Sequence, residues 1–320
     1  MNKTLSKILK IAIPLGLGIF LIWYIYQQFT PSQLKETKEH FKNAHYGFVA
    51  LSVLLSILSH LSRAYRWSFM LQPLGYTPKL ANNFMAISVA YLMNIFIPKS
   101  GEVSRGIILD KYENIPFEKG FGTIISERIV DLLFLLAFTG LALFLKFDVL
   151  YDYVVSSIPP SFLYKAVIAF VIFTALVLLF LKFSKSKINT KIKNFVIGLK
   201  DGVLSVVKMK KKGAFIFHTF LIWGLYLLSF YVATKALDET TTIGFGTIII
   251  AFVVGSFTFA FTNSGFGTYP AAIAGILVLF SVPITAGTAF GWIVWTSNIA
   301  SILIFGVLSL LLLPIYNKKT

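Results

Sequence analysis

Two hydrophobic segments, one in each half of the chain, are each interrupted by a short polar turn. The first covers residues 82–98 and breaks at 98–105, and the second covers 243–262 and breaks at 263–270. Bilayer hydrocarbon cannot hydrogen-bond to an interrupted backbone, so such breaks persist only inside protein or beside a water-filled cavity. Broken helices at corresponding places in two halves are typical of transporters, and they predict a binding site near the middle of the membrane.

The rest of the chain is predicted to consist largely of membrane helices. It is 57% hydrophobic and 13% charged, and about 20 apolar residues are enough to cross a bilayer as a helix. The first apolar stretch is too long for a cleaved signal peptide and is expected to remain as an anchor. Full spans are predicted at about 8–29, 46–66, 117–145, 162–183, 214–236 and 286–313.

A net charge of +16 would suit a nucleic-acid partner, but the distribution of charge argues against one. Residues 182–212 hold ten Lys against the single Asp201, whereas the loops on the opposite side are nearly balanced in charge. Basic loops stay on the cytoplasmic side of a membrane. The protein is therefore expected in the plasma (inner) membrane as a multi-pass protein with both termini in the cytoplasm.

The same rule decides how the broken segments enter the membrane. If residues 82–98 crossed it fully, the ten-Lys segment would lie outside the cell, against the charge rule. A re-entrant hairpin from the cytoplasmic side avoids this, and residues 243–282 then form a hairpin from the outer side. The expected fold is an all-α integral membrane protein with six full transmembrane helices plus two re-entrant helical hairpins arranged as an inverted repeat.

We expect residues 1–320 to form a single polytopic membrane domain. The first half covers about 1–183 and the second half about 213–320. The segment between them, about 184–212, carries apolar residues at helical spacing with Lys largely on the other face. This pattern is typical of a basic amphipathic helix in the cytoplasmic interface, and a solvated linker is the alternative.

Charged residues inside hydrophobic segments are the best indication of chemistry. Glu127 and Asp131 are four residues apart in the third predicted span and share a helix face, with Arg128 about 100° away. A charge at the centre of a membrane helix costs at least ~2.5–3.5 kcal/mol, so such residues pair or line a wet path. Glu102 and Arg105, in the first break, are the expected partners. The alternative is that these charges brace helices near the headgroups.

Two other groups of residues suggest anion binding. Arg63 and Arg66 end the second predicted span, where they either anchor the helix in the interface or clamp a lipid phosphate. In the second break, residues 264–268 precede a helix, and a helix start offers N–H donors to an anion. The two breaks are expected to meet across a polar cavity that Arg105 faces, forming one headgroup site.

These residues also carry a family resemblance. The motifs, in chain order, are Arg63-x-x-Arg66-Trp67, Asn94-x-x-x-Pro98-x-x-Gly101-Glu102-x-x-Arg105, Glu127-Arg128-x-x-Asp131 and the Gly265-x-Gly267 turn. Together they resemble the lysylphosphatidylglycerol synthase transmembrane family, also described as flippase-like, which includes the membrane half of the multiple peptide resistance factor. The resemblance covers nearly the whole chain. It implies movement of a lipid between leaflets, with these polar residues along the headgroup path.

The chain departs from the family pattern in the second break. The family usually has a Pro-Gly-Gly-like turn followed by Glu, whereas here Asn263-Ser264-Gly265 precedes Phe266, and Tyr269-Pro270 stands where an acid is expected. With the sequence ending at Thr320, no soluble aminoacyl-transferase domain is expected and no synthesis of lysyl-lipid.

The predicted function is a lipid translocase for an anionic phospholipid or a polyprenyl-phosphate-linked lipid, without a cofactor, a metal or enzymatic activity. The alternative is a non-transporting membrane partner or scaffold for a lipid-modifying or glycosyltransferase system. Association with itself or with a lipid-modifying enzyme stays open. The predicted substrate-binding residues are Arg63, Arg66, Asn94, Pro98, Gly101, Glu102, Arg105, Glu127, Arg128, Asp131, Asn263, Ser264, Gly265, Gly267 and Thr268.

Overall fold

The described part of the protein is built from helices. The computed structural model describes residues 16, 18–20, 22–24, 26–149, 151–152, 164–165, 168, 171–172, 209–262 and 264–318. In this part, four helical segments are long and apolar enough to cross a membrane: Tyr46–Leu74, Phe117–Leu145, Lys212–Ala236 and Ile284–Tyr316. They confirm four of the predicted spans. The prediction at 8–29 falls half outside the described residues and that at 162–183 largely outside them, and the basic segment at 184–212 lies outside except for its last few residues.

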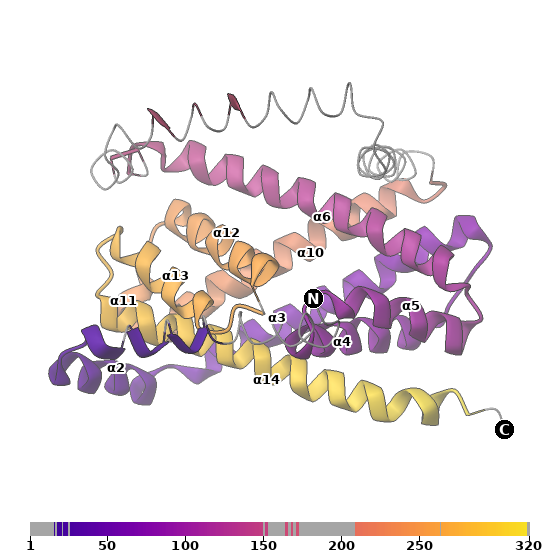
Figure 1. The fold of residues 1–320 in the computed structure, drawn as a ribbon, viewed down its shortest axis with the longest axis horizontal. Helices are drawn as coiled ribbons and strands as arrows, with labels where there is room; N and C mark the ends of the chain where they lie inside the picture. Colours follow the sequence, from indigo (N-terminus) through magenta and orange to yellow (C-terminus); the bar gives the residue numbers. More distant parts are fainter. Residues whose placement is uncertain are drawn as a thin grey trace.

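Each long segment contains one α-helix, and shorter helices lie between them (Figure 1). The long helices are α3 (Tyr46–Leu71), α6 (Phe117–Leu145), α10 (Lys212–Ala233) and α14 (Ile284–Tyr316). The two interrupted segments fold as helix pairs, α4 (Leu80–Phe96) with α5 (Ser100–Glu113), and α12 (Phe245–Phe261) with α13 (Thr268–Val278). The remaining elements are α2 (Pro31–Asn43), η1 (Gln72–Leu74), η2 (Thr234–Ala236) and α11 (Asp238–Thr241).

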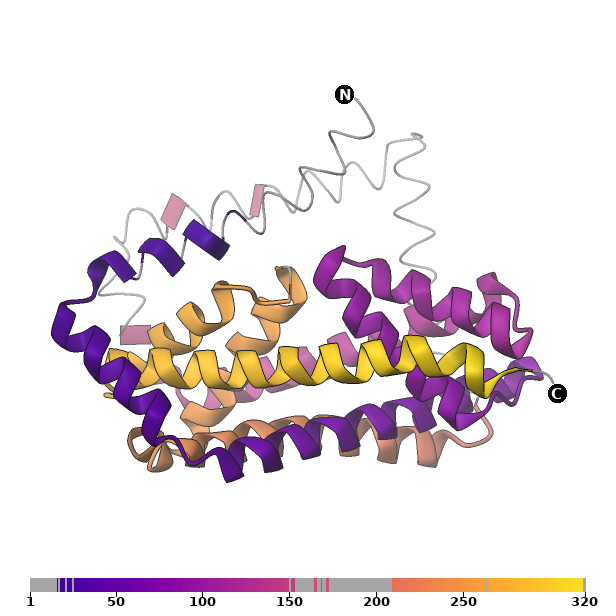
Figure 2. The same ribbon diagram turned by 90° about the horizontal axis from the view of Figure 1, so that it is seen from below.

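Helices α3 and α10 form an antiparallel pair along one side of the molecule (Figure 2). Small polar side chains of α3 face α10. Ser52 Oγ lies 2.9 Å from Ser229 Oγ, and Ser62 Oγ lies 2.9 Å from Nδ1 of His218. The residue numbers run in opposite directions, which fixes the antiparallel orientation. Small side chains let two membrane helices approach closely, and the hydroxyls hydrogen-bond across the contact.

The two halves repeat one packing pattern. In each half, a long helix is followed by a broken helix pair and then by another long helix. The first helix of each pair packs against the last long helix of the other half, since α4 contacts α14 and α12 contacts α6. Both contacts are antiparallel: Asn82 on α4 bonds to Asn317 just after α14, and Gly246 on α12 lies against Lys146 just after α6.

The break between α4 and α5 is a tight turn closed by side chains. Lys99 adopts a left-handed backbone conformation with φ +63°. The amide of Gly101 then donates to Oδ1 of Asn94 at 2.8 Å. Gly101 packs so closely on α4 that a Cβ atom there would collide with the carbonyl oxygen of Ala90. Glycine is therefore required by the approach of the two helices.

In the break between α12 and α13, three of the described residues have positive φ: Ser264 (+53°), Gly265 (+73°) and Gly267 (+67°). The amide of Gly265 donates to Thr262 Oγ1, and the carbonyl of Ser264 accepts from the indole of Trp295 on α14. The turn is thus held both by its own hydroxyls and by the neighbouring helix.

Candidate functional site

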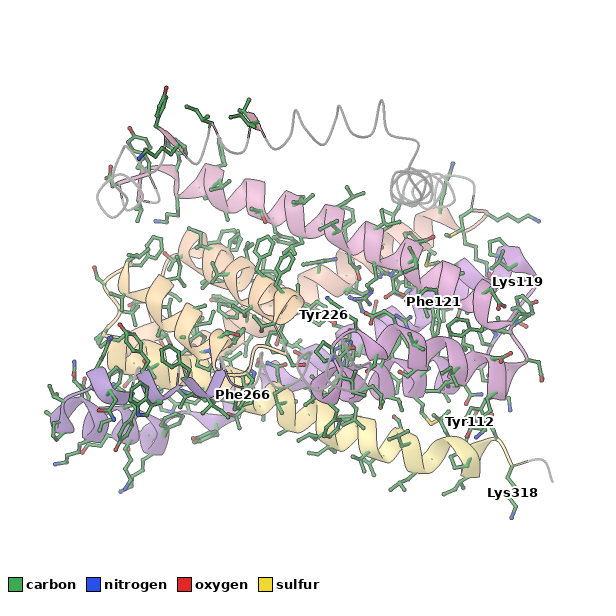
Figure 3. The ribbon with its side chains drawn as sticks, in the orientation of Figure 1. Tyr112, Lys119, Phe121, Tyr226, Phe266 and Lys318 are labelled. Atoms are coloured by element: carbon green, nitrogen blue, oxygen red, sulfur yellow. The ribbon has the colours of Figure 1, made fainter. Side chains whose placement is uncertain are left out.

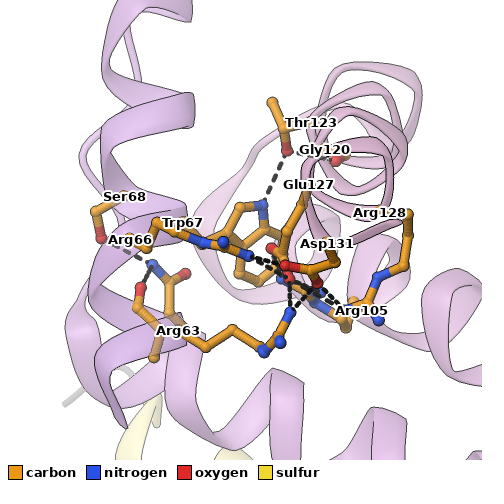
Figure 4. A network of polar contacts seen from close by, with 12 residues as sticks. Arg63, Arg66, Trp67, Ser68, Arg105, Gly120, Thr123, Glu127, Arg128 and Asp131 are labelled. Carbon is orange, nitrogen blue, oxygen red and sulfur yellow. Dashed lines mark hydrogen bonds and ion pairs between the residues drawn. The ribbon is translucent and has the colours of Figure 1, made fainter. Parts of the chain in front are cut away.

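A cluster of charged side chains lies between α3, α5 and α6 (Figure 4). Helix α3 supplies Arg63 and Arg66, α5 supplies Arg105, and α6 supplies the remaining members, Glu127, Arg128 and Asp131. Arg63 lies eight residues before the end of α3, and Glu127 lies ten residues after the start of α6. At 1.5 Å per residue, the cluster lies roughly 12 Å from the C-terminal end of α3 and roughly 15 Å from the N-terminal end of α6.

Glu127 is the centre of this cluster. Its carboxylate is fully buried and accepts hydrogen bonds from three guanidinium groups, at 2.6 Å from Arg63, 2.9 Å from Arg105 and 3.0 Å from Arg128. Arg66 Nη2 lies 3.5 Å from the same carboxylate. A buried carboxylate needs this number of partners, because an uncompensated charge in a low-dielectric interior is very costly.

Asp131, one turn further along α6, completes the ion-pair network. It accepts hydrogen bonds from Arg63 at 2.5 Å and from Arg66 at 3.0 Å. Arg63 therefore bridges the two carboxylates, which share one face of α6 as their spacing of four residues predicted. Arg128, three residues before Asp131, is 38% exposed at its side chain, whereas those of Arg63, Arg66 and Arg105 are almost fully buried.

The cluster carries more positive than negative charge. Four guanidinium groups contact two carboxylates, which leaves a net charge of +2. The Nε atoms of Arg63, Arg66, Arg105 and Arg128 are also buried without a hydrogen-bond partner. Buried donors are nearly always satisfied in native proteins, so four unsatisfied ones in a single cluster need an explanation. An anion would supply both the missing charge and the missing acceptors.

Neighbouring side chains hold the arginines in place. The guanidinium of Arg105 stacks on the ring of Trp67, with Cζ 3.9 Å from the ring centroid. The indole of Trp67 in turn donates to Thr123 Oγ1 at 2.9 Å. Arg66 donates to Thr219 on α10 at 3.1 Å. Cation–π stacking and hydrogen bonds of this kind fix the planar guanidinium groups more tightly than charge alone would.

A group of aromatic residues extends from the cluster toward the centre of the molecule. Tyr226, placed there in Figure 3, lies beneath the guanidinium of Arg63, with 6.0 Å from Cζ to the ring centroid. Its hydroxyl is 3.3 Å from that of Tyr91, on which His60 stacks at 4.6 Å between ring centroids. Sequence reasoning missed these three residues, because aromatic side chains in apolar helices carry no signal that separates them from ordinary packing.

The two breaks meet each other, as predicted. Nζ of Lys99 in the first break donates to the carbonyl of Ala260 in the last turn of α12 at 2.9 Å. Ser264 Oγ in the second break donates to the carbonyl of Asn94 at 3.4 Å. We call this pair of contacts the tip contact. It joins the two halves at their broken helices.

Several predicted placements are wrong. Arg63 and Arg66 do not anchor α3 in the interface, because both are buried and paired with carboxylates. Arg105 pairs with Glu127, which confirms one of the two expected partners, but it stacks on Trp67 and does not face the other break as expected. Glu102 joins none of the ion pairs of the described residues, and its Oε2 is buried without a partner.

The second break is also less open to an anion than expected. The amide of Tyr269 donates to the carbonyl of Gly265 at 2.8 Å, and Thr268 Oγ1 lies 3.0 Å from Thr262 Oγ1. Gly267 packs against the backbone of Gly18. Because Gly265 and Gly267 both have positive φ, a larger residue at either position would strain the turn. Asn263 lies outside the described residues, and no contact in the described part singles out Pro98.

Two pockets flank these sites. One, of about 460 Å³, lies between the end of α3, η1, Met209 and the first turns of α6, where Thr123 lines it, and no member of the charged cluster lines it. The other, of about 420 Å³, is mainly apolar and lies between α2, α13, α14 and residues near 22–29. Each has the size of a small-ligand pocket. Arg105 lines neither of them.

Long apolar helices, two interrupted helix pairs that touch and a buried cluster of charges define a polytopic membrane protein with a polar interior. Comparison of the sequence with known proteins is consistent with this class. The model of the lysylphosphatidylglycerol synthase transmembrane region matches residues 9–306. The chain belongs to this family.

Individual relatives are distant. A UPF0104 membrane protein of Methanocaldococcus jannaschii is 32% identical over 100 residues, which cover 30% of this chain and 30% of that protein. A second UPF0104 membrane protein of the same organism is 28% identical over 228 residues, or 68% of this chain and 92% of the relative. Glycosyltransferase AglD of Haloferax volcanii is 29% identical over 98 residues, covering 30% of this chain and only 16% of AglD. No solved structure matches the chain.

Proposed function

We propose that this protein is a lipid translocase that binds an anionic phospholipid or a polyprenyl-phosphate-linked lipid and moves it between the leaflets. The observation that carries the proposal is the buried cluster around Glu127 and Asp131, with its net charge of +2 and its four unpartnered Nε donors. A lipid phosphate would neutralise the excess charge and accept hydrogen bonds from the free donors.

The arrangement of charge favours binding of a ligand over bracing of helices alone. Bracing needs no more positive than negative charge, because every extra buried charge raises the cost of desolvation. Here Glu127 and Asp131 already balance two of the four arginines. The remaining positive charge has no compensation from the described carboxylates. Charges inside membrane proteins that exceed their partners typically mark a substrate path.

The proposed path begins at the pocket of about 460 Å³ beside α6. Thr123 lines this pocket and accepts a hydrogen bond from Trp67, and the Trp67 ring stacks on Arg105. The side chain of Trp67 thus connects the pocket wall to the charged cluster. None of the four arginines lines the pocket itself, so a headgroup entering here would pass Trp67 before it reached them.

The proposed topology has six full spans and two re-entrant hairpins in an inverted repeat, in the inner membrane with both termini in the cytoplasm. The exchanged packing of α4 on α14 and α12 on α6 supports it, because a two-fold relation between the halves would produce this pair of contacts. Lys119, in the first turn of α6, and Lys318, near the C-terminus, lie at the same end of the molecule (Figure 3). Their common position agrees with one basic, cytoplasmic side.

Translocation requires no bond to be made or broken, so the proposed activity is not enzymatic. A scaffold for a lipid-modifying or glycosyltransferase system is the second candidate. The match to 16% of a protein named glycosyltransferase AglD favours it, since a segment similar to part of this chain occurs within a glycosyltransferase. A scaffold moves no lipid on its own, so reconstitution separates the two functions.

The test is transport in liposomes that contain only the purified protein. Fluorescently labelled phosphatidylglycerol in the inner leaflet becomes accessible to a membrane-impermeant quencher only if it is moved outward. We expect faster loss of fluorescence with protein than in protein-free liposomes. Arg128→Gln should slow transport of the anionic lipid, and Lys111→Gln, a change at an exposed lysine in the last turn of α5 that lines neither pocket, should not. Equal rates with and without protein would refute translocation and favour the scaffold.

A further inference from the structure

Lys99 is a charged residue at the tip contact whose role the charged cluster does not explain. Its ammonium donates to the carbonyl of Ala260 at 2.9 Å, and no carboxylate of the described chain forms an ion pair with it. Ala260 lies in the last turn of α12, where carbonyl groups are unsatisfied and the helix dipole is negative. A single carbonyl partly satisfies the ammonium but does not neutralise its charge.

The surroundings of Lys99 are apolar and open. Lys99 is exposed, as are Phe96 and Ile97 beside it and Phe261 at the end of α12, which is 78% exposed. Helix α4 has 17 residues and is about 25 Å long, shorter than a hydrocarbon core about 30 Å thick. In the proposed topology α4 enters from the cytoplasmic side, so Lys99 at its end stays within the hydrocarbon, where an exposed charge is costly unless it finds an anion or reaches water.

The backbone at Lys99 gives independent support. Lys99 has φ +63°, a left-handed conformation that glycine adopts freely and a lysine adopts only at a cost. In the second break two of the described positive-φ positions are glycines, Gly265 and Gly267, and the third is Ser264. Strained residues of this kind concentrate at functional positions, where their side chain is needed. The turn therefore retains a lysine although a glycine would be less strained.

We propose that Lys99 is a phosphate-binding residue at which the lipid headgroup passes the tip contact while its tails stay in the bilayer. The ammonium exchanges the carbonyl of Ala260 for a phosphate oxygen, so arrival of the headgroup loosens the contact between the halves. The exposed apolar side chains around it face the lipid tails. A lipid phosphate fits this position, because a free phosphate ion would have to enter an apolar environment without tails to hold it there. This inference rests on the proposed translocation.

The experiment compares lipid transport by Lys99→Gln, Lys99→Arg and the unaltered protein in the same liposomes. Glutamine keeps an N–H donor for Ala260 and is as strained as lysine at this φ, so it removes mainly the charge. We expect Lys99→Gln to slow phosphatidylglycerol transport about tenfold, the factor for losing one hydrogen bond between charged groups. Lys99→Arg should keep most of the rate. Lys235→Gln is the matched control, because Lys235 also donates to a main-chain carbonyl, that of Thr241 at 2.7 Å.

Two readouts separate a binding role from a structural one. If Lys99 only joined the helices, its replacement by Gln would lower the melting temperature. Loss of the lysine charge would then leave the preference between anionic and zwitterionic lipid unchanged. We expect Lys99→Gln to melt with the unaltered protein and to lose preference for phosphatidylglycerol over zwitterionic phosphatidylcholine. Normal transport by Lys99→Gln, with Arg128→Gln slow, would overturn this inference alone. No transport by the unaltered protein would overturn the proposed function with it.

Discussion

Glu127 is the residue whose loss should disturb the molecule most. Its buried carboxylate contacts four guanidinium groups at 2.6, 2.9, 3.0 and 3.5 Å. Glu127→Gln keeps the shape of the side chain but raises the net charge of the cluster from +2 to +3. Removing one member of a buried ion pair typically costs about 3–5 kcal/mol, because it leaves uncompensated charge in a low-dielectric interior.

The assay is thermal unfolding in detergent. A loss of 3–5 kcal/mol corresponds to a fall in melting temperature of roughly 6–15 °C for a domain of a few hundred residues. Glu118→Gln is the matched control, because Glu118 lies on the same helix but is exposed, and it should melt with the unaltered protein. Restoring the net charge with Glu127→Gln/Arg105→Gln should recover part of the loss, since residues in one network are coupled.

Two outcomes of the melting experiment would contradict this prediction. If Glu127→Gln unfolds at the temperature of the unaltered protein, the cluster is not a compensated network and the argument from charge balance fails. If the double variant is as unstable as the sum of the two single variants, Arg105 and Glu127 are not energetically coupled. The proposed reason for a positive, anion-binding interior would then be lost.

Two further predictions concern topology and the first break. Single cysteines introduced at Ser186 and at Asp148 should be labelled by an impermeant maleimide from opposite sides of the membrane, and labelling of Ser186→Cys from outside intact cells would contradict cytoplasmic termini. Gly101→Ala should destabilise the α4–α5 turn by about 1–3 kcal/mol, because the new methyl group collides with the carbonyl oxygen of Ala90. Gly122→Ala, with open space around it, should leave the melting temperature unchanged.

Much of the fold followed from the sequence because the lipid environment restricts the choices. Runs of apolar residues gave the long helices, and the polar breaks after residues 98 and 262 gave the helix pairs. The pairing of Glu127 and Asp131 with arginine also followed, since charges four residues apart share a face. These features could be predicted because hydrophobic length, a polar break and a spacing of four residues each depend on a single helix or turn.

What the sequence did not predict depends on the angles between helices. Arg63 and Arg66 stand near the end of an apolar run, where interfacial residues are common, and only the packing of α6 across α3 buries them. Arg105 was expected both to pair with the carboxylates of α6 and to face a cavity between the two breaks. It lies five residues into α5, where it pairs with Glu127 but does not reach the other break. Lys99, which does make the tip contact, has no distinguishing neighbours in the sequence.

The charge of the two halves is unequal although their packing is similar, and this has a consequence for transport. The arginines and carboxylates come from α3, α5 and α6, while the second break offers hydroxyls and backbone groups. An anionic headgroup should therefore rest longest at the cluster around Glu127, on one side of the tip contact.

Uneven affinity along the transport path changes where the lipid binds longest and how fast it crosses. It leaves the equilibrium between the leaflets unchanged, because both directions pass the same states. Net movement in one direction would then require a lipid gradient or a coupled ion. Measuring transport in both orientations tests this: without a gradient, the labelled lipid should reach the same final distribution from either leaflet.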